Sequence, residues 1–213
     1  ADTWTNLGGV IVAQKLYQSG ATDMSPPISQ LLRVDQSKQR YRDLRRVLGL
    51  DLKHESRRRQ DVDVVFLAAF PRQARLIRPQ LRFHHAADLP VFATSHVYAG
   101  IPNPPADTDI DGVWFGDMPW VLYDGGAHGR LRNETQQAWG SIFERYARLY
   151  AFGTDAYAIV PYLGKLRAQP NAELPGETGW LSVAQDNRVH RRLEWAQFIK
   201  GLPTLIDVQE IEQ

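Results

Sequence analysis

The residues best placed for chemistry in this sequence are Ser95 and His96, which follow an apolar stretch of strand length at residues 89–94. In open α/β sheets, ligands bind beyond the carboxyl ends of the strands. We therefore expect His96 either to border a binding cleft or to make ordinary loop hydrogen bonds, and a hydrolase centred on Ser95, His96 and Asp117 is a rival interpretation. The sequence has no Gly-x-Ser-x-Gly elbow, Walker phosphate loop, His-Glu-x-x-His pair or Gly-x-Gly-x-x-Gly turn. We predict a protein that is not an enzyme and has no catalytic residues.

Metal and cofactor chemistry has little support in the sequence. Residues 107–112 match the opening of a calcium loop, but Met118 stands where the twelfth position requires a bidentate glutamate. We expect a solvated acidic loop. The chain has no cysteine, which excludes disulfides and cysteine-ligated metal centres. His84 and His85 end a predicted helix, where a cation interacts favourably with the helix dipole. We predict no metal site and no cofactor.

Positive charge gathers in one part of a chain that is nearly neutral overall. The net charge is +1, whereas residues 33–82 hold 14 Lys and Arg against 6 Asp and Glu. Arg57, Arg58 and Arg59 are our candidate contacts for an anionic partner, with arginines that simply stay in water as the alternative. We expect no nucleic-acid partner, because few aromatic residues interleave with this basic part. No apolar run approaches the roughly 20 residues that span a bilayer.

The elements that position these residues alternate between strands and helices in the first half of the chain. The continuous apolar runs at 62–69 and 89–94 predict buried strands, and the helical pattern at 71–84 predicts the connecting helix of a parallel βαβ unit. Pro79 implies either a kink in this helix or a helix in two parts. We predict further strands at 10–17, bordering the sheet, and at 112–115. A short helix opens at Pro26, and a second at 37–48 is expected to bury Tyr41, Leu44 and Leu48.

The second half of the chain has a different composition. A glycine-rich stretch at 123–130 is expected to break regular structure before helices at 133–151 and 154–168. An antiparallel hairpin is predicted from 179–183 and 189–198. The aromatic cluster of Trp114, Phe115, Trp120 and Tyr123 either walls a ligand cleft or packs a hinge. Residues 1–9 have the pattern of a helix tail that ends at a glycine, so we expect the chain to begin inside a domain.

Several linked segments, in order and spacing, resemble the C-terminal domain of the LppC/LpoA family. They include "LGGVIVAQKLY", "RRRQDVDVVFLAAFPRQARLIRPQLRF", "LPVFATSHVYAG", "DIDGVWFGDMPW" and "GETGWLSVAQDNRVHRRLEWAQFIKG". The resemblance implies a type I periplasmic-binding-protein fold of two α/β lobes. Residues 1–118 and 176–213 would form the second lobe, a parallel sheet flanked by helices. Residues 119–175 would form the crossover and a helical portion of the first lobe.

The resemblance also implies a function. Members of this family are outer-membrane lipoproteins described as activators of a class A penicillin-binding protein, so we expect a regulatory module in the periplasm. Its lipid anchor would be N-terminal and absent from this chain. The alternative is a small-ligand sensor that uses the cleft between the lobes. Candidate cleft residues are Phe70, Ser95, His96, Tyr98, Trp120, Asp155 and Tyr157, and the candidate partner contacts are Arg57, Arg58 and Arg59.

Overall fold

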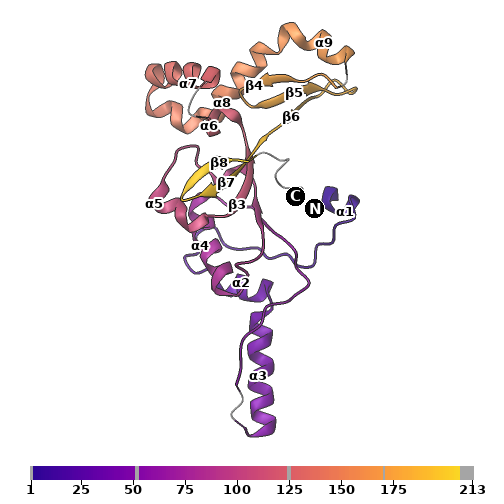
Figure 1. Cartoon of the computed structure of the whole chain (residues 1–213), viewed down its shortest axis with the longest axis vertical. Helices are drawn as coiled ribbons and strands as arrows, with labels where there is room; N and C mark the ends of the chain where they lie inside the picture. Colours follow the sequence, from indigo (N-terminus) through magenta and orange to yellow (C-terminus); the bar gives the residue numbers. More distant parts are fainter. Residues whose placement is uncertain (1, 51–52, 124–125, 170, 207–213) are drawn as a thin grey trace.

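The computed structural model describes residues 2–50, 53–123, 126–169 and 171–206, and its largest element is a five-stranded sheet (Figure 1). The strand order is β1-β2-β3-β7-β8, in which β1, β2 and β3 are parallel and the last two strands are antiparallel. The strand bounds are Val65–Leu67 (β1), Val91–Ala93 (β2), Val113–Asp117 (β3), Glu194–Ile199 (β7) and Leu202–Leu205 (β8). The α/β class predicted from the sequence is confirmed.

The predicted βαβ unit is formed by β1, α4 (Pro71–Phe83) and β2. Proline is accepted at the first position of α4, where its missing N–H would have no helical partner. The predicted apolar register is confirmed, since Ala74, Ile77 and Leu81 are all buried. Pro79 lies inside one continuous helix, so the two-part alternative is wrong.

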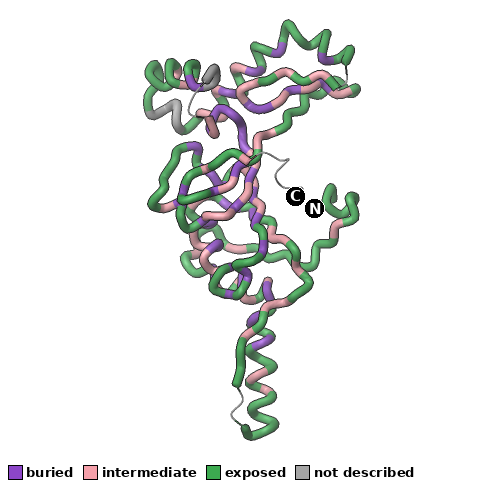
Figure 2. The backbone as a smooth tube through the Cα atoms, viewed as in Figure 1, coloured by how far each residue is buried: buried purple, intermediate pink, exposed green. Residues whose placement is uncertain are grey.

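The two faces of the five-stranded sheet differ in burial because successive side chains on a strand point to opposite faces. Phe115 and Phe198, on the covered face, stack with ring centroids 4.9 Å apart, and both are almost fully buried. Phe92, Trp114 and Trp195 lie on the other face, where Phe92 and Trp114 are half-buried and Trp195 is exposed. Helices α2 (Ser25–Leu31) and α4 contribute Ile28, Ile77 and Leu81 to the same core as the covered face. Figure 2 shows the buried residues gathered there.

A second, smaller sheet lies with the helices of the second half of the chain, at the top of Figure 1. Leu166 of α9 packs with Leu181 and Val183 of β5 in a separate apolar cluster. The elements are α6 (Pro119–Leu122), α7 (Gly126–Trp139), α8 (Ser141–Ala158), η3 (Val160–Tyr162), α9 (Leu163–Ala168), β4 (Leu174–Gly176), β5 (Gly179–Val183) and β6 (Val189–Arg192).

Two predictions in this half need correction. Helix α7 already begins at Gly126, inside the stretch expected to be irregular, of which residues 124–125 lie outside the described residues. The break between the two long helices falls at Gly140, which has a φ of 56°, a backbone conformation that glycine adopts without steric cost. Gly153 lies within α8, so the predicted break near residue 152 is wrong.

The predicted hairpin is half right. Strands β5 and β6 pair antiparallel, with Val183 opposite Val189. Past residue 192 the chain leaves the small sheet, and from Glu194 it pairs with β3 of the large one, where Glu194 lies opposite Asp117. The segment expected to be the second arm, 189–198, is therefore divided between a strand of the small sheet and a strand of the large one. The division into lobes stays a prediction, and residues 207–213 of the expected second lobe lie outside the described residues.

The strand predicted at 10–17 does not form. This segment follows α1 (Asp2–Asn6), and its backbone carries no ladder with β1. Its contacts are made through side chains: Arg59 donates a hydrogen bond to the Val12 carbonyl (3.2 Å), and the Tyr17 hydroxyl donates one to the Ala68 carbonyl (2.8 Å). Alternating apolar residues are therefore insufficient here, because a strand also requires a neighbour in register.

Helix α3 (Val34–Leu48) projects from the body and shares little surface with it (Figures 1 and 2). The prediction that Leu44 and Leu48 are buried is wrong, since they are 53% and 52% exposed, and Tyr41 is only half-buried. The helix begins after Arg33 (φ 57°) and ends at Gly49 (φ 65°). Short helical turns complete the fold at η1 (Ser95–Val97), α5 (Pro104–Asp107) and η2 (Thr108–Ile110). No helix in the described ranges is both long and apolar enough to cross a bilayer.

Candidate cleft and interaction surface

The carboxyl ends of β1 and β2 bring Phe70 and His96 together. Phe70 directly precedes α4, and His96 lies in η1, just after β2. Their rings meet edge to face with centroids 5.5 Å apart, and both side chains are exposed. Ser95 is the neighbour of His96 and is half-buried. Three of the predicted cleft residues are thus grouped at the sheet edge where ligands of α/β folds bind.

Tyr98 and Trp120 are buried in the packing of the molecule. The Tyr98 ring contacts Phe115 and Phe198, with centroids 5.9 and 6.0 Å away. Trp120 is 1% exposed, and its backbone N–H donates to the Glu177 carbonyl at 3.0 Å. For Trp120, the structure favours hinge packing over a cleft wall.

Asp155 holds the turn between β4 and β5. Its carboxylate accepts hydrogen bonds from the backbone N–H groups of Glu177 and Thr178, both at 2.7 Å, and from the Thr178 hydroxyl at 2.5 Å. A Cβ atom at Gly176 would lie 2.8 Å from the carboxylate oxygens, so the close approach requires glycine. Tyr157, two residues further along α8, is 86% exposed. Asp155 is thus engaged in a structural contact, whereas Tyr157 faces solvent.

A buried ion pair that the sequence did not reveal joins α8 to β3. Arg148 donates to both carboxylate oxygens of Asp117, at 2.5 and 3.2 Å, and to the Tyr98 carbonyl at 3.0 Å. Asp117 is 1% exposed and also accepts from the Met118 N–H at 2.9 Å. The only sequence signal was a lone charge among the apolar residues 146–151. Because the carboxylate of Asp117 has these partners, it is not positioned to orient His96, and the hydrolase interpretation loses its third residue.

The three predicted partner arginines differ in their surroundings. Arg58 donates to the His85 carbonyl at 2.7 Å and to Asp88 at 2.6 Å. Arg59 clamps Asp61 with two hydrogen bonds of 2.6 Å, which lower the pKa of that carboxyl to about 2. Arg57 is exposed. Two of the three guanidinium groups are therefore already neutralised within the chain, and their role in partner binding stays a prediction.

The acidic loop is not the solvated segment that the sequence predicts. Asp107 is 3% exposed and pairs with Arg75 at 2.7 Å, and Asp111 accepts a hydrogen bond from the Gly201 N–H at 2.8 Å. These carboxylates hold the loop against α4 and against the turn between β7 and β8. Within the described part of the chain, no group of three or more His, Cys, Asp or Glu side chains is arranged to hold a metal ion.

The surroundings of His84 favour its neutral form, whereas the sequence predicted a cation at the end of α4. It is 3% exposed, and its Nε2 lies 3.0 Å from the Ser25 hydroxyl of α2. Burial lowers the pKa of His84, and the positive charges of Lys38 and His85 lower it further. The side chain therefore links two helices in its uncharged form.

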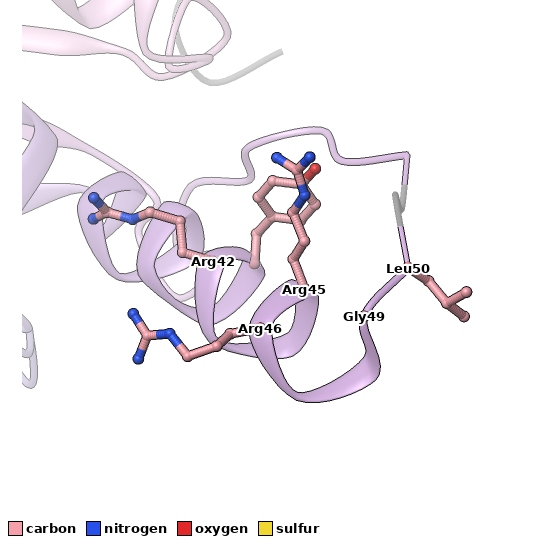
Figure 3. Close-up of a pocket in the computed structure, with 6 residues that line it drawn as sticks. Arg42, Arg45, Arg46, Gly49 and Leu50 are labelled. Atoms are coloured by element: carbon pink, nitrogen blue, oxygen red, sulfur yellow. The ribbon is translucent and has the colours of Figure 1, made fainter.

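A pocket of about 600 Å³ opens at the tip of α3, and sequence reasoning did not identify it as a site. Figure 3 shows Arg42 and Arg46 extending to one side of the helix, with Leu50 on the other side. The Tyr41 ring stacks on His54 of the returning chain, with centroids 4.4 Å apart. The full lining is Tyr41, Arg42, Arg45, Arg46, Gly49 and Leu50. The signal in the sequence was three arginines at a spacing of three and four residues beside leucines.

The chain is similar in sequence to curated relatives over most of its length. The penicillin-binding protein activator LpoA of Klebsiella pneumoniae subsp. pneumoniae is 26% identical over 217 residues, which cover 94% of this chain and 29% of that protein. The chain thus spans less than a third of this curated relative.

Solved structures resemble the chain in fold. The C-domain of LpoA (YraM) from Haemophilus influenzae, described as a regulator of PBP1A, has a TM-score of 0.57 and 21% identity, covering 78% of this chain and 49% of that one. The leucine-binding protein LivK of Thermotoga maritima has a TM-score of 0.52 and 13% identity, covering 97% and 53%. These matches confirm the periplasmic-binding-protein-like fold.

The family itself is shown by the match to a model of a whole protein family. That model, described as "LppC putative lipoprotein", covers residues 1–201. Since the match extends over nearly all of the 213 residues, the chain belongs to the LppC family.

Proposed function

We propose that this chain is a non-enzymatic regulatory module that binds and activates a class A penicillin-binding protein, and thereby promotes peptidoglycan synthesis. The observation that carries the proposal is the family: relatives across the chain are named penicillin-binding protein activators, and the solved C-domain is described as a regulator of PBP1A. The site geometry supports it. Asp117 is the third residue of the hydrolase hypothesis, and Asp155 is a candidate cleft residue. Both carboxylates already accept hydrogen bonds that hold the fold together.

Activation of this kind needs no chemistry in the module. A protein that binds the active conformation of its partner more tightly than the inactive one shifts the partner's population toward activity. A tenfold shift requires a difference in binding free energy of about 1.4 kcal/mol between the two states. Coupling free energies between two binding sites are typically about 1–3 kcal/mol, so a difference of this order is an ordinary one.

The same proposal places the module in the periplasm, held at the outer membrane by an N-terminal lipid. The 213 residues contain no cysteine, so the lipidated residue would lie outside them. We also propose that residues 1–118 and 176–213 belong to a second lobe and residues 119–175 to the first, with β5 of the second lobe packed against α9 of the first. The Asp117–Arg148 ion pair would then tie the two lobes at the crossover.

The direct test adds the purified chain to a purified class A penicillin-binding protein and follows glycan polymerisation and crosslinking. We expect at least one rate to rise in a saturable way. A heat-denatured sample of the same chain is the control for non-specific protein effects. Unchanged rates at saturating concentrations would refute the proposal.

A small-ligand sensor is the second candidate, favoured by one observation: the exposed Phe70–His96 pair at the carboxyl edge of the sheet. The likeness to a leucine-binding protein is one of fold alone and supplies no ligand. Calorimetric titration with amino acids and muropeptides separates the two functions. Saturable heat that disappears in Phe70→Ala would establish the sensor, and its absence from the wild type would eliminate it.

A further inference from the structure

We propose that the tip of helix α3 is the docking site for an acidic segment of the partner protein, bound through Arg42 and Arg46 and through the apolar side chains beside them. This inference rests on the proposed function, because it assigns the surface and the chemistry by which the module holds its penicillin-binding protein. The site is distinct from the candidates Arg58 and Arg59, whose charges are already paired within the chain.

The charge on α3 exceeds what the helix itself can neutralise. Its fifteen residues, Val34–Leu48, contain five Lys or Arg residues and two Asp residues. Asp43 lies 3.8 Å from Arg46 in an exposed pair, which contributes little in water. Arg42 and Arg46 are four residues apart, so they extend from one face of the helix and repel each other. A carboxylate placed between them would turn this repulsion into attraction.

Apolar surface adjoins these charges. Leu48 and Leu50 are 52% and 61% exposed, and Leu50 lines the same pocket as the three arginines. Tyr41, which also lines the pocket, stacks on His54, and a side chain held in this way loses less conformational entropy on binding. A helix tip that carries exposed guanidinium groups on one side and exposed leucines nearby fits a partner segment that carries carboxylates beside an aliphatic or aromatic side chain.

The arrangement favours an acidic protein segment over an anionic membrane surface or a nucleic acid. A membrane-surface helix needs a continuous apolar face along its length, whereas the exposed leucines lie only in the last two turns of α3. For nucleic acid, the pocket offers Tyr41 as its one aromatic lining residue, and that ring is already stacked on His54. Arginine also pairs with a carboxylate through two parallel hydrogen bonds, which gives the contact direction as well as attraction.

The test compares two double variants of the 213-residue chain that change its net charge equally. Arg42→Glu/Arg46→Glu reverses the charge at the proposed site. Arg40→Glu/Arg167→Glu is the matched control: Arg40 is exposed on α3 but lies about 160° around the helix from Arg42, and Arg167 is exposed on α9. Circular dichroism and thermal unfolding verify that both variants fold. Binding to the purified synthase is measured at 50 and 500 mM NaCl, and binding to phosphatidylglycerol vesicles is measured in parallel.

We expect the site variant to raise the Kd for the synthase at least tenfold and the control to change it less than twofold. The wild-type Kd should rise at high salt, which screens charge pairs. If the wild type binds the synthase and the site variant binds it with the same Kd as the control, this inference is overturned, while the proposed function stands. A wild type that does not bind the synthase would overturn both. Loss of vesicle binding alone in the site variant would assign the arginines to a membrane surface and also refute the inference.

Discussion

The ion pair between Arg148 and Asp117 provides the sharpest test of the structure. Replacing Arg148 with methionine keeps the apolar stem of the side chain but removes the guanidinium. Asp117, which is 1% exposed, would keep only the Met118 N–H among the hydrogen bonds described above. Removing one partner of a buried ion pair typically costs about 3–5 kcal/mol. Because the Arg148 side chain is 33% exposed, water will partly solvate the remaining charge, and we expect the lower figure, about 3 kcal/mol.

Thermal and urea unfolding measure this loss. For a chain of this size, 1 kcal/mol corresponds to about 2–4 °C, so the midpoint of Arg148→Met should fall by about 6–12 °C. The control is Arg145→Met, an exposed arginine one turn earlier on α8, for which we expect a change within about 0.5 kcal/mol.

A double-mutant cycle isolates the pair from other effects of the substitution. Replacing both partners, as in Asp117→Leu/Arg148→Met, leaves no unpaired buried charge, so the double variant should be more stable than the sum of the single losses predicts. We expect a coupling of about 2 kcal/mol. A loss below about 1 kcal/mol in Arg148→Met, or a coupling near zero, would show that the two side chains do not hold α8 against β3.

Three further predictions concern other contacts. Asp155→Ala removes the acceptor of three hydrogen bonds and should lower the free energy of unfolding by about 3–5 kcal/mol, whereas Thr178→Val removes one of them and should cost about 1–2; urea unfolding of both checks the ratio. Because the pKa of His84 is lowered in the folded chain, the unfolded chain binds a proton at this imidazole more readily than the folded chain does. The contribution of His84 to the free energy of unfolding is therefore fully present above the ordinary pKa of 6.5 and is lost as the pH falls through the lower pKa of the folded state. The unfolding midpoint should therefore decrease from pH 7.5 to 5, and a variant with His84→Gln should show a smaller decrease; equal slopes would contradict this. Gly179→Ala places a Cβ atom 2.3 Å from the Arg192 carbonyl oxygen at a φ of 132° and should cost more than about 1 kcal/mol, with a lower thermal midpoint as the readout.

The elements that the sequence predicted well are those with strong local patterns. The apolar runs around β1 and β2 and the register of Ala74, Ile77 and Leu81 on α4 identify a strand–helix–strand unit without any knowledge of the neighbours. Periodicity reports which face of an element is apolar, and this information lies within a few residues. The position of Ser95 and His96 at the sheet edge follows from that unit and its parallel strands.

The patterns that failed are those whose meaning depends on distant parts of the chain. Residues 10–17 alternate like a strand, yet they form no ladder with β1. Leu44 and Leu48 share a helical face with the half-buried Tyr41, yet more than half of each leucine side chain is exposed, because α3 projects from the body. An apolar face indicates that another element can pack against it, but the local sequence does not specify which element does.

The sequence alone predicts an α/β protein. It also establishes that the chain has no cysteine, a net charge near zero and a basic first half. Only the tertiary structure decided which charges are paired within the fold and which side chains face solvent. Arg148 and Asp117 are 31 residues apart and pair at 2.5 Å, Arg58 reaches Asp88, and Arg42 and Arg46 are exposed on a projecting helix. The physical reason is that the free energy of an ion depends on the atoms packed around it, and folding brings those atoms from positions that no local pattern connects.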